Sequence, residues 1–199
     1  MNRYTAVMGH DCLQNLVSHT VRQGETLSVI AERYGIQFIH EGLLAFVNET
    51  KPPIYLEVGK KIRLPNGQWS LQINTNFFRL SLVQDQSPVK AYEIAVGTGG
   101  TPTPEGKFEI AYVKGKPMWY PPPDRGIAGP VPYGHPAHPL GEVWIALNHP
   151  TYKDYGIHGT PVEECIGTRV SHGCVRMRNP DVLELAALVY PGMPVRIVN

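Results

Sequence analysis

Glycine and proline interrupt this chain too often for long regular elements to form. They contribute 20 and 19 of its 199 residues, and proline breaks helix and strand interiors while glycine permits turns. Between these breaks 42% of the residues are hydrophobic, which argues against disorder. The pattern predicts many short strands joined by tight connections, in one domain or two small ones.

Charge and cysteine usage exclude several classes of protein. A net charge of +1 gives no reason to expect nucleic acid or an anionic membrane as a partner. No apolar run approaches the length of a membrane span. The first fifteen residues lack the charged region and apolar core of a secretory signal, so we expect a mature chain or another route of export. The three cysteines, Cys12, Cys165 and Cys174, leave at least one thiol outside any disulfide.

Residues 18–66 begin with the pattern of a short strand followed by a helix. Val21 lies between polar neighbours, and the hydroxyl of Thr26 can cap the helix that follows the next turn. The helix has the i, i+3, i+4, i+7 spacing of one buried face, at Leu27, Ile30, Ala31 and Tyr34. Gly35 then tolerates the positive φ that ends a helix.

The same segment continues with a second helix and a closing strand. We expect the helix over residues 40–47, although Gly42 inside it disfavours helix. Residues 58–65 predict a turn and a strand that proline stops. The segment is therefore expected to be a strand, helix, helix, strand module.

The residues of this module resemble a LysM domain. The stretches HTVRQGETLSVIAERYG and VGKKIRLP carry the resemblance over residues 18–66, and it implies binding of N-acetylglucosamine-containing glycans such as peptidoglycan or chitin. Where the family usually has Asn-Pro after the second helix, this chain has Asn48-Glu49 and a long loop, so its contacts with the glycan can differ. The alternative is that this module serves only as a packing or spacer domain.

Residues 67–199 form the second predicted domain, separated by the turn signal Asn66-Gly67. Apolar residues alternate there with mostly polar ones, as in half-buried strands. The alternation covers Leu71 and Ile73, Phe78, Leu80 and Leu82, and Tyr92, Ile94 and Val96. Residues 74–76 are expected to close the first hairpin, and further strands are expected over residues 107–113, 143–147 and 195–198.

One late helix completes the second domain. Asn179-Pro180-Asp181 predicts its start, with a capping side chain, a proline in the first turn and an acid beside the helix dipole. Its buried face is expected at Val182, Leu185, Ala186 and Val189. Many strands with one late helix predict a mainly β fold, a sandwich or a barrel.

Two loops of this domain invite functional readings. Residues 97–106 are rich in Gly, Pro and Thr, but a phosphate loop would need a lysine and a following helix that are missing. Residues 115–140 are rich in Gly and Pro and carry Trp119, Tyr120 and Tyr133. Such a loop is either a lid or binding wall, or its rings plug the end of the core.

Five histidines share the last third of the chain with two cysteines, and two kinds of site explain such a cluster. The histidines are His135, His138, His149, His158 and His172. A zinc site is disfavoured because the chain has neither Cys-x-x-Cys nor His-Glu-x-x-His, and Pro136 interrupts the closest histidine pair. We therefore expect no metal.

Thiol nucleophilic catalysis is the second kind of site, with Cys174 as the nucleophile. Gly173 permits a tight turn, so that its amide and that of Cys174 could face an oxyanion. His158 lies between Ile157 and Gly159 in Gly-Ile-His-Gly, where the ring is approachable. His172 is expected to support the loop, because neighbours in an extended segment point apart. Arg176 would share a strand face with Cys174 and either lower the pKa of the thiol or bind a substrate carboxylate.

The motif YGIHGT, followed after a spacer by SHGCVRM, resembles the catalytic motif of the L,D-transpeptidases of the YkuD family. The stretch TGGTPTPEGKFEI also agrees. The resemblance implies a β-sandwich, Cys174 as nucleophile, His158 as general base, and a backbone carbonyl near Gly159 that orients the imidazole. Where many members have Asn, this chain has Arg176.

The resemblance also implies the reaction. It is acyl transfer on peptidoglycan stem tetrapeptides, which releases D-Ala and forms 3→3 cross-links or, with water, gives L,D-carboxypeptidase activity. No cofactor or metal is implied, and carbapenems are expected to acylate Cys174. Arg176, Ser171, Tyr155 and Trp119 are the candidate substrate-binding residues.

An alternative reading is a non-catalytic peptidoglycan-binding protein of a spore or wall. Both readings place the chain in the cell envelope or spore wall, with peptidoglycan as its partner. Cys165 is expected to be a structural thiol rather than a redox partner of Cys174.

Overall fold

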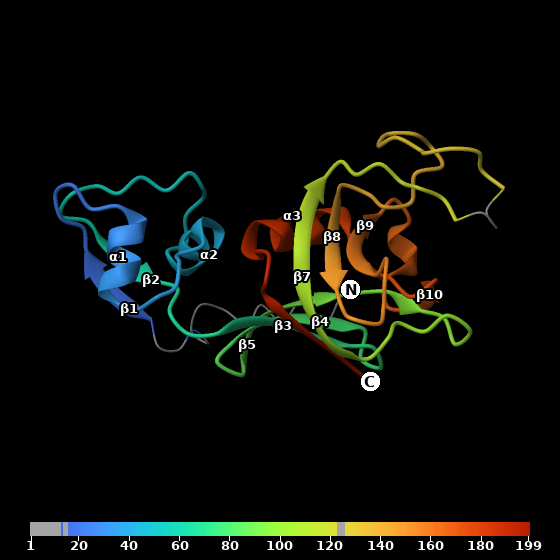
Figure 1. Cartoon of the computed structure of the whole chain (residues 1–199), viewed down its shortest axis with the longest axis horizontal. Helices are drawn as coiled ribbons and strands as arrows, with labels where there is room; N and C mark the ends of the chain where they lie inside the picture. The colour runs from blue at the N-terminus through green and yellow to red at the C-terminus, as the bar shows by residue number, and fades with distance from the viewer. Residues whose placement is uncertain (1–12, 14–15, 123–125) are drawn as a thin grey trace.

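The computed structural model describes residue 13 and residues 16–122 and 126–199 (Figure 1). Cys12 lies outside the described residues. Within them, no helix has both the length and the apolar character needed to cross a membrane. The chain forms a small N-terminal part and a larger, mainly β part, and this confirms the predicted fold class.

The N-terminal part has the predicted strand, helix, helix, strand order. It consists of β1 (Val17–Thr20), α1 (Leu27–Arg33), α2 (Glu41–Val47) and β2 (Lys61–Leu64), and β1 pairs antiparallel with β2. The expected cap is present, because Thr26 Oγ1 accepts from the Val29 amide at 3.3 Å. Ile30 and Ala31 are buried, and Gly35 has a φ of 64° just beyond the helix.

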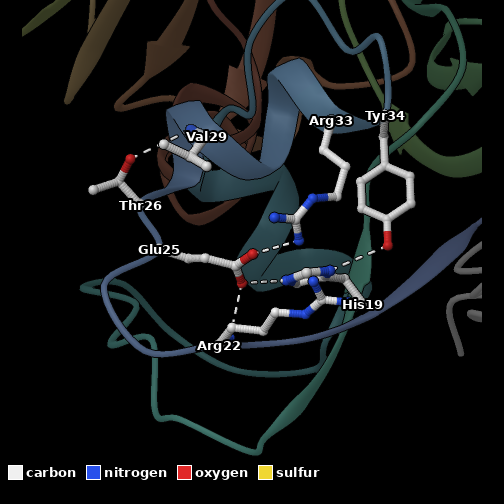
Figure 2. Close-up of polar contacts among 7 residues, drawn as sticks. All are labelled: His19, Arg22, Glu25, Thr26, Val29, Arg33 and Tyr34. Atoms are coloured by element: carbon white, nitrogen blue, oxygen red, sulfur yellow. Dashed lines mark hydrogen bonds and ion pairs between the residues drawn. The ribbon is translucent and has the colours of Figure 1, made fainter.

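A polar network joins α1 to β1 (Figure 2). The Glu25 carboxylate contacts the Arg33 guanidinium, accepts from the Arg22 amide at 2.8 Å, and lies 2.7 Å from His19 Nε2. The other ring nitrogen of His19 is 3.1 Å from the Tyr34 hydroxyl. Burial alone would raise the pKa of Glu25, but these contacts lower that pKa to about 2. The carboxylate therefore remains charged and holds the strand and helix together across the neutral range.

Helix α2 is shared by both parts of the protein. Its Leu44 belongs to the core of the N-terminal part, whereas Leu43 and Val47 belong to the core of the larger part. A Cβ atom at Gly42 would overlap the backbone carbonyl of Ala187. The glycine that disfavours the helix in the sequence is therefore what allows α2 to approach the larger part so closely.

The described residues of the larger part contain ten strands. They are β3 (Trp69–Asn74), β4 (Arg79–Gln84), β5 (Ser87–Glu93), β6 (Val96–Gly97), β7 (Gly106–Gly115), β8 (Val143–Asn148), β9 (Gly156–Thr160), β10 (Arg169–Ser171), β11 (Val175–Arg178) and β12 (Pro194–Val198). Eight form one mixed sheet in the order β11-β9-β8-β7-β12-β3-β4-β5, and β6 pairs with β10. The sheet curls, so that β7 and β8 run across the direction of β3 and β4 (Figure 1).

Helix α3 (Asn179–Leu188) packs its Val182, Leu185 and Leu188 into the core of the curled sheet. The predicted cap is wrong: Arg178 is the N-cap residue and makes no side-chain cap bond. Asn179 instead lies within the helix, and its Oδ1 accepts from the Glu142 amide at 3.0 Å. The side chain thus joins α3 to the start of β8. Its hydrogen bond with the Glu142 amide takes the place of the local cap.

The described segments of the long loop, residues 115–122 and 126–140, have more order than their composition predicts. Trp119 and Val131 exchange two backbone hydrogen bonds, of 2.9 and 2.8 Å. Nearer the sheet, Nε2 of the buried His138 lies 2.8 Å from the Pro117 carbonyl oxygen, and the Tyr133 hydroxyl donates to Glu142 at 2.6 Å. Both ends of the loop are therefore held against the sheet.

Candidate active site

Strand pairing brings His158 and Cys174 to one face at the edge of the sheet. Strands β9 and β11 are parallel, with Arg176 opposite His158. Cys174 immediately precedes β11 and lies two residues before Arg176. It therefore shares the face of Arg176 and His158, about 7 Å before Arg176 along the strand direction. Residues sixteen positions apart in the sequence are thus neighbours because their strands pair in parallel.

The backbone determines which nitrogen of His158 can act as a base. Nδ1 lies 2.6 Å from the Gly159 carbonyl oxygen, and a carbonyl can only accept, so Nδ1 carries the proton. Nε2 is then unprotonated in the neutral ring. Trp144, directly opposite on β8, stacks on the ring at a centroid distance of 5.8 Å and an interplanar angle of 24°.

The imidazole is neutral across most of the pH range. Burial lowers the pKa of His158 to about 4, and the positive charge of Arg176 and the nearby His138 act in the same direction. The bond to Gly159 opposes this shift but does not cancel it. A neutral imidazole can accept a proton, as a general base must.

The thiol of Cys174 is also neutral at pH 7. Burial raises its pKa, while the Gly156 backbone and Arg176 lower it. Its Sγ also donates to the Asp154 carbonyl oxygen at 3.9 Å. The structure therefore holds a neutral thiol and a neutral imidazole, which favours proton transfer during attack over a preformed ion pair.

Hydrogen bonds within the loop place the nucleophile. The buried Ser171 hydroxyl donates to the Cys174 carbonyl at 2.5 Å and accepts from the Gly173 amide at 3.1 Å. The expected oxyanion donor Gly173 is thus already bonded, and Ser171 contacts the loop itself. Gly173 has a φ of 110°, and a Cβ there would overlap the Tyr155 ring, so only glycine fits.

The remaining sequence candidates lie in different surroundings. Tyr155 packs against Gly173 and edge-on to Tyr152. His172 is exposed. Trp119 is half-buried and pairs with Val131 in the long loop. Cys165 ends the 3₁₀ helix η3 (Glu163–Cys165), and like Cys174 it is a free thiol.

Sequence reasoning missed three residues of this site. Trp144 stacks on His158, and the Asn179 side chain lies against Gly159. The Asp154 carbonyl oxygen accepts from the Cys174 thiol. Only strand pairing reveals the first, since Trp144 lies in an ordinary apolar strand pattern. Among the described residues, no cluster of His, Cys, Asp and Glu could hold a metal ion.

Comparison with known proteins defines the class of this fold and site. The YkuD family, described as the L,D-transpeptidase catalytic domain, matches residues 68–197, and the LysM domain matches residues 19–65. The chain belongs to the YkuD family of L,D-transpeptidases and carries an N-terminal LysM domain.

Its relatives extend over nearly the whole chain. The YkuD protein of Bacillus licheniformis is 32% identical over 191 residues, which cover 92% of this chain and 99% of that protein. The YkuD protein of Bacillus subtilis is 30% identical with the same coverage of both chains.

Solved structures share the fold of the larger part. The catalytic domain of an E. faecium L,D-transpeptidase aligns with a TM-score of 0.52 at 20% identity, over 67% of this chain and 98% of that one. The same domain has been solved acylated by ertapenem. An L,D-transpeptidase from Mycobacterium smegmatis gives a TM-score of 0.53 at 17% identity, over 71% and 64% of the chains. At these identities the likeness shows the fold alone.

Proposed function

We propose that this chain catalyses cysteine acyl transfer on the tetrapeptide stems of peptidoglycan. The observation that carries the proposal is the bond from His158 Nδ1 to the Gly159 carbonyl. It leaves Nε2 free to accept a proton on the face that Cys174 shares. A backbone carbonyl thereby performs the orienting role that a carboxylate performs in a Ser-His-Asp triad.

The first step forms a thioester on Cys174. As Sγ attacks the carbonyl of the diamino acid at stem position three, the thiol proton passes to His158 Nε2. The tetrahedral intermediate collapses when the carbon–nitrogen bond to the terminal D-Ala breaks. The protonated imidazole gives its proton to the departing amine, so D-Ala leaves with the base restored.

The second step consumes the thioester. A side-chain amine of another stem loses a proton to His158 and attacks the thioester carbonyl. The carbon–sulfur bond then breaks and the thiolate takes that proton from His158, which gives a 3→3 cross-link and the free thiol. Water in place of the amine gives L,D-carboxypeptidase activity. Carbapenems would acylate the same sulfur, because its attack on their β-lactam carbonyl opens that ring.

The loop before β11 supplies the stabilising groups. Because the Gly173 amide is bonded to Ser171, we assign the oxyanion to the Cys174 amide. His172 supports the loop. Arg176, Tyr155 and Trp119 remain proposed substrate contacts, with the Arg176 guanidinium suited to a stem carboxylate because its buried Nε has no hydrogen-bond partner among the described residues.

The LysM domain would raise the concentration of the enzyme on an insoluble glycan. We therefore place the protein in the cell envelope or spore wall, with peptidoglycan as its partner. The alternative, a wall-binding protein without activity, is disfavoured because Arg176 lies opposite His158, which puts Cys174, two residues earlier, on the face of the base.

Mass spectrometry of disaccharide-tetrapeptide after incubation with the protein tests the reaction. We expect loss of D-Ala together with a cross-linked dimer, and loss of D-Ala with a tripeptide product where water is the acceptor. Intact tetrapeptide at the end of the incubation would contradict the enzymatic function.

Replacing Arg176 by glutamine should raise two pKa values together. The guanidinium lowers the pKa of both Cys174 and His158, so its removal moves the alkylation profile of the thiol to higher pH. It also moves the imidazole titration above its present value of about 4. Iodoacetamide kinetics and NMR titration of the imidazole measure the two shifts, and Arg176→Lys, which keeps the charge, is the control. Unchanged profiles would show that Arg176 is not the activating charge.

A further inference from the structure

A cleft of about 990 Å³ separates the LysM domain from the catalytic domain. Phe38 and His40 contribute to its wall from the LysM side, and Phe38 meets Tyr190 edge-on at 4.8 Å between ring centroids. The ring of Phe38 remains 46% exposed. Such a mixed lining of aromatic and polar side chains at a domain junction is typical of ligand sites.

The floor of the cleft carries two cations side by side. Lys107 on β7 and Arg196 on β12 stand directly opposite each other in the antiparallel register, and Gln72 on β3 is the next partner of Arg196. All three are exposed and line the cleft. Like charges directly opposite in a sheet destabilise it.

No described residue compensates this pair of charges. The side chains of Lys107 and Arg196 make no ion pair or hydrogen bond with another residue that the structure describes. Asp85 also lines the cleft, but its Oδ1 accepts from the Gln68 amide at 2.7 Å. A bound anion would therefore stabilise this arrangement.

The two cations lie on the same face of the sheet as the catalytic base. His158 and Trp144 stack, and Asn148 follows Trp144 on the same face by the alternation of β8. Asn148 donates to Glu109 at 2.9 Å, which places Glu109 on that face. Lys107 lies two residues before Glu109 on β7 and therefore on the same face.

A continuous surface therefore connects the cleft with the catalytic site. Strands β9, β8, β7 and β12 are successive neighbours, three inter-strand steps of about 4.8 Å apart in all. The register of His158 reaches β7 at Lys114, seven residues from Lys107, which adds about 20 Å along β7, so His158 and Arg196 lie roughly 25 Å apart.

We infer that Lys107 and Arg196, with Gln72, form a subsite for a carboxylate of a peptidoglycan stem peptide whose sugars lie in the cleft against Phe38. This rests on the proposed function and names a further contact with the same polymer. The Arg196 guanidinium can bind a carboxylate through two parallel hydrogen bonds, and the Gln72 amide can bind an adjacent peptide group.

Calorimetric titration of the full chain carrying Cys174→Ala with disaccharide-tetrapeptide tests the subsite, because this ligand is then not consumed. The double replacement Lys107→Gln/Arg196→Gln should weaken binding about tenfold, as expected for the loss of a charge-assisted hydrogen bond. The same ligand with its carboxylates amidated should bind the parent protein as weakly. Arg79→Gln is the matched control, since Arg79 is an exposed arginine of the same sheet that stands opposite Glu93.

Thermal unfolding separates this role from a structural one. Removing the two opposed cations in the double variant should leave the Tm of the free protein unchanged or raise it, while binding weakens. A lowered Tm with unchanged affinity would overturn the inference. So would equal binding of the amidated ligand, an equal effect of Arg79→Gln, or tighter binding of poly(glycerol phosphate) than of the muropeptide at these cations.

Release of D-Ala by the unsubstituted protein is measured in parallel. If no D-Ala is released, the proposed reaction fails, whereas the binding comparison still decides the subsite. If D-Ala is released and the double variant binds normally, only the subsite is rejected.

Discussion

Replacing Cys174 by alanine should lower D-Ala release from disaccharide-tetrapeptide by at least about 10³-fold, because the proposed thioester forms on its sulfur. Cys174 is half-buried, and the loop that holds it depends on Ser171 and Gly173, whose hydrogen bonds use the hydroxyl and the backbone. The replacement removes only the sulfur and should leave the fold intact. Mass spectrometry of the products and a Tm measurement check both statements.

Cys165 provides the matched control. It is also a free, partly exposed thiol, and it lies in η3, away from the His158 register. Cys165→Ala should release D-Ala at the rate of the unsubstituted protein. A large loss with Cys165→Ala, or activity that survives Cys174→Ala, would contradict the assignment of the nucleophile.

Replacing the buried Gly42 by alanine should destabilise the protein more than replacing a glycine on its surface. The new Cβ would overlap the Ala187 carbonyl oxygen and lie 2.8 Å from its carbon, so α2 must move away from α3. Leu43 and Val47 would then lose part of their packing in the larger core. Overpacking of this kind costs about 3 kcal/mol, or roughly 6–12 °C in Tm for a chain of this size.

Differential scanning calorimetry with Gly99→Ala as control measures this loss. A Cβ at Gly99 would meet nothing within 4 Å, so that replacement should leave the Tm almost unchanged. Limited proteolysis should also cut the Gly42→Ala protein faster near the junction of the two parts. If both variants melted at the same temperature, the close approach of α2 and α3 would not contribute to stability.

Local patterns were sufficient for most elements. The cap at Thr26, the helix end at Gly35 and the alternation at Leu71 and Ile73 all depend on residues close in the sequence, and the structure confirms each of them. The failed prediction at Asn179 has the opposite cause. Its side chain could either cap the helix end or bond the Glu142 amide, which is distant in the sequence, and it bonds Glu142.

The short strands β6 and β10 are another feature that the sequence pattern missed. They consist of Val96–Gly97 and Arg169–Ser171, which are too short for any alternation to appear. They pair in parallel across more than seventy positions, and only the folded chain places them together.

The sequence by itself determined the fold class, the LysM module and the identity of the residues proposed for catalysis, because local periodicity and a contiguous motif encode them. Only the tertiary structure decided how those residues relate. Parallel pairing of β9 with β11 aligns Arg176 with His158, burial makes the imidazole neutral, and Trp144 stacks on it. The physical reason is that register, burial and the pKa of a side chain depend on neighbours that are distant in the sequence, and no local pattern records them.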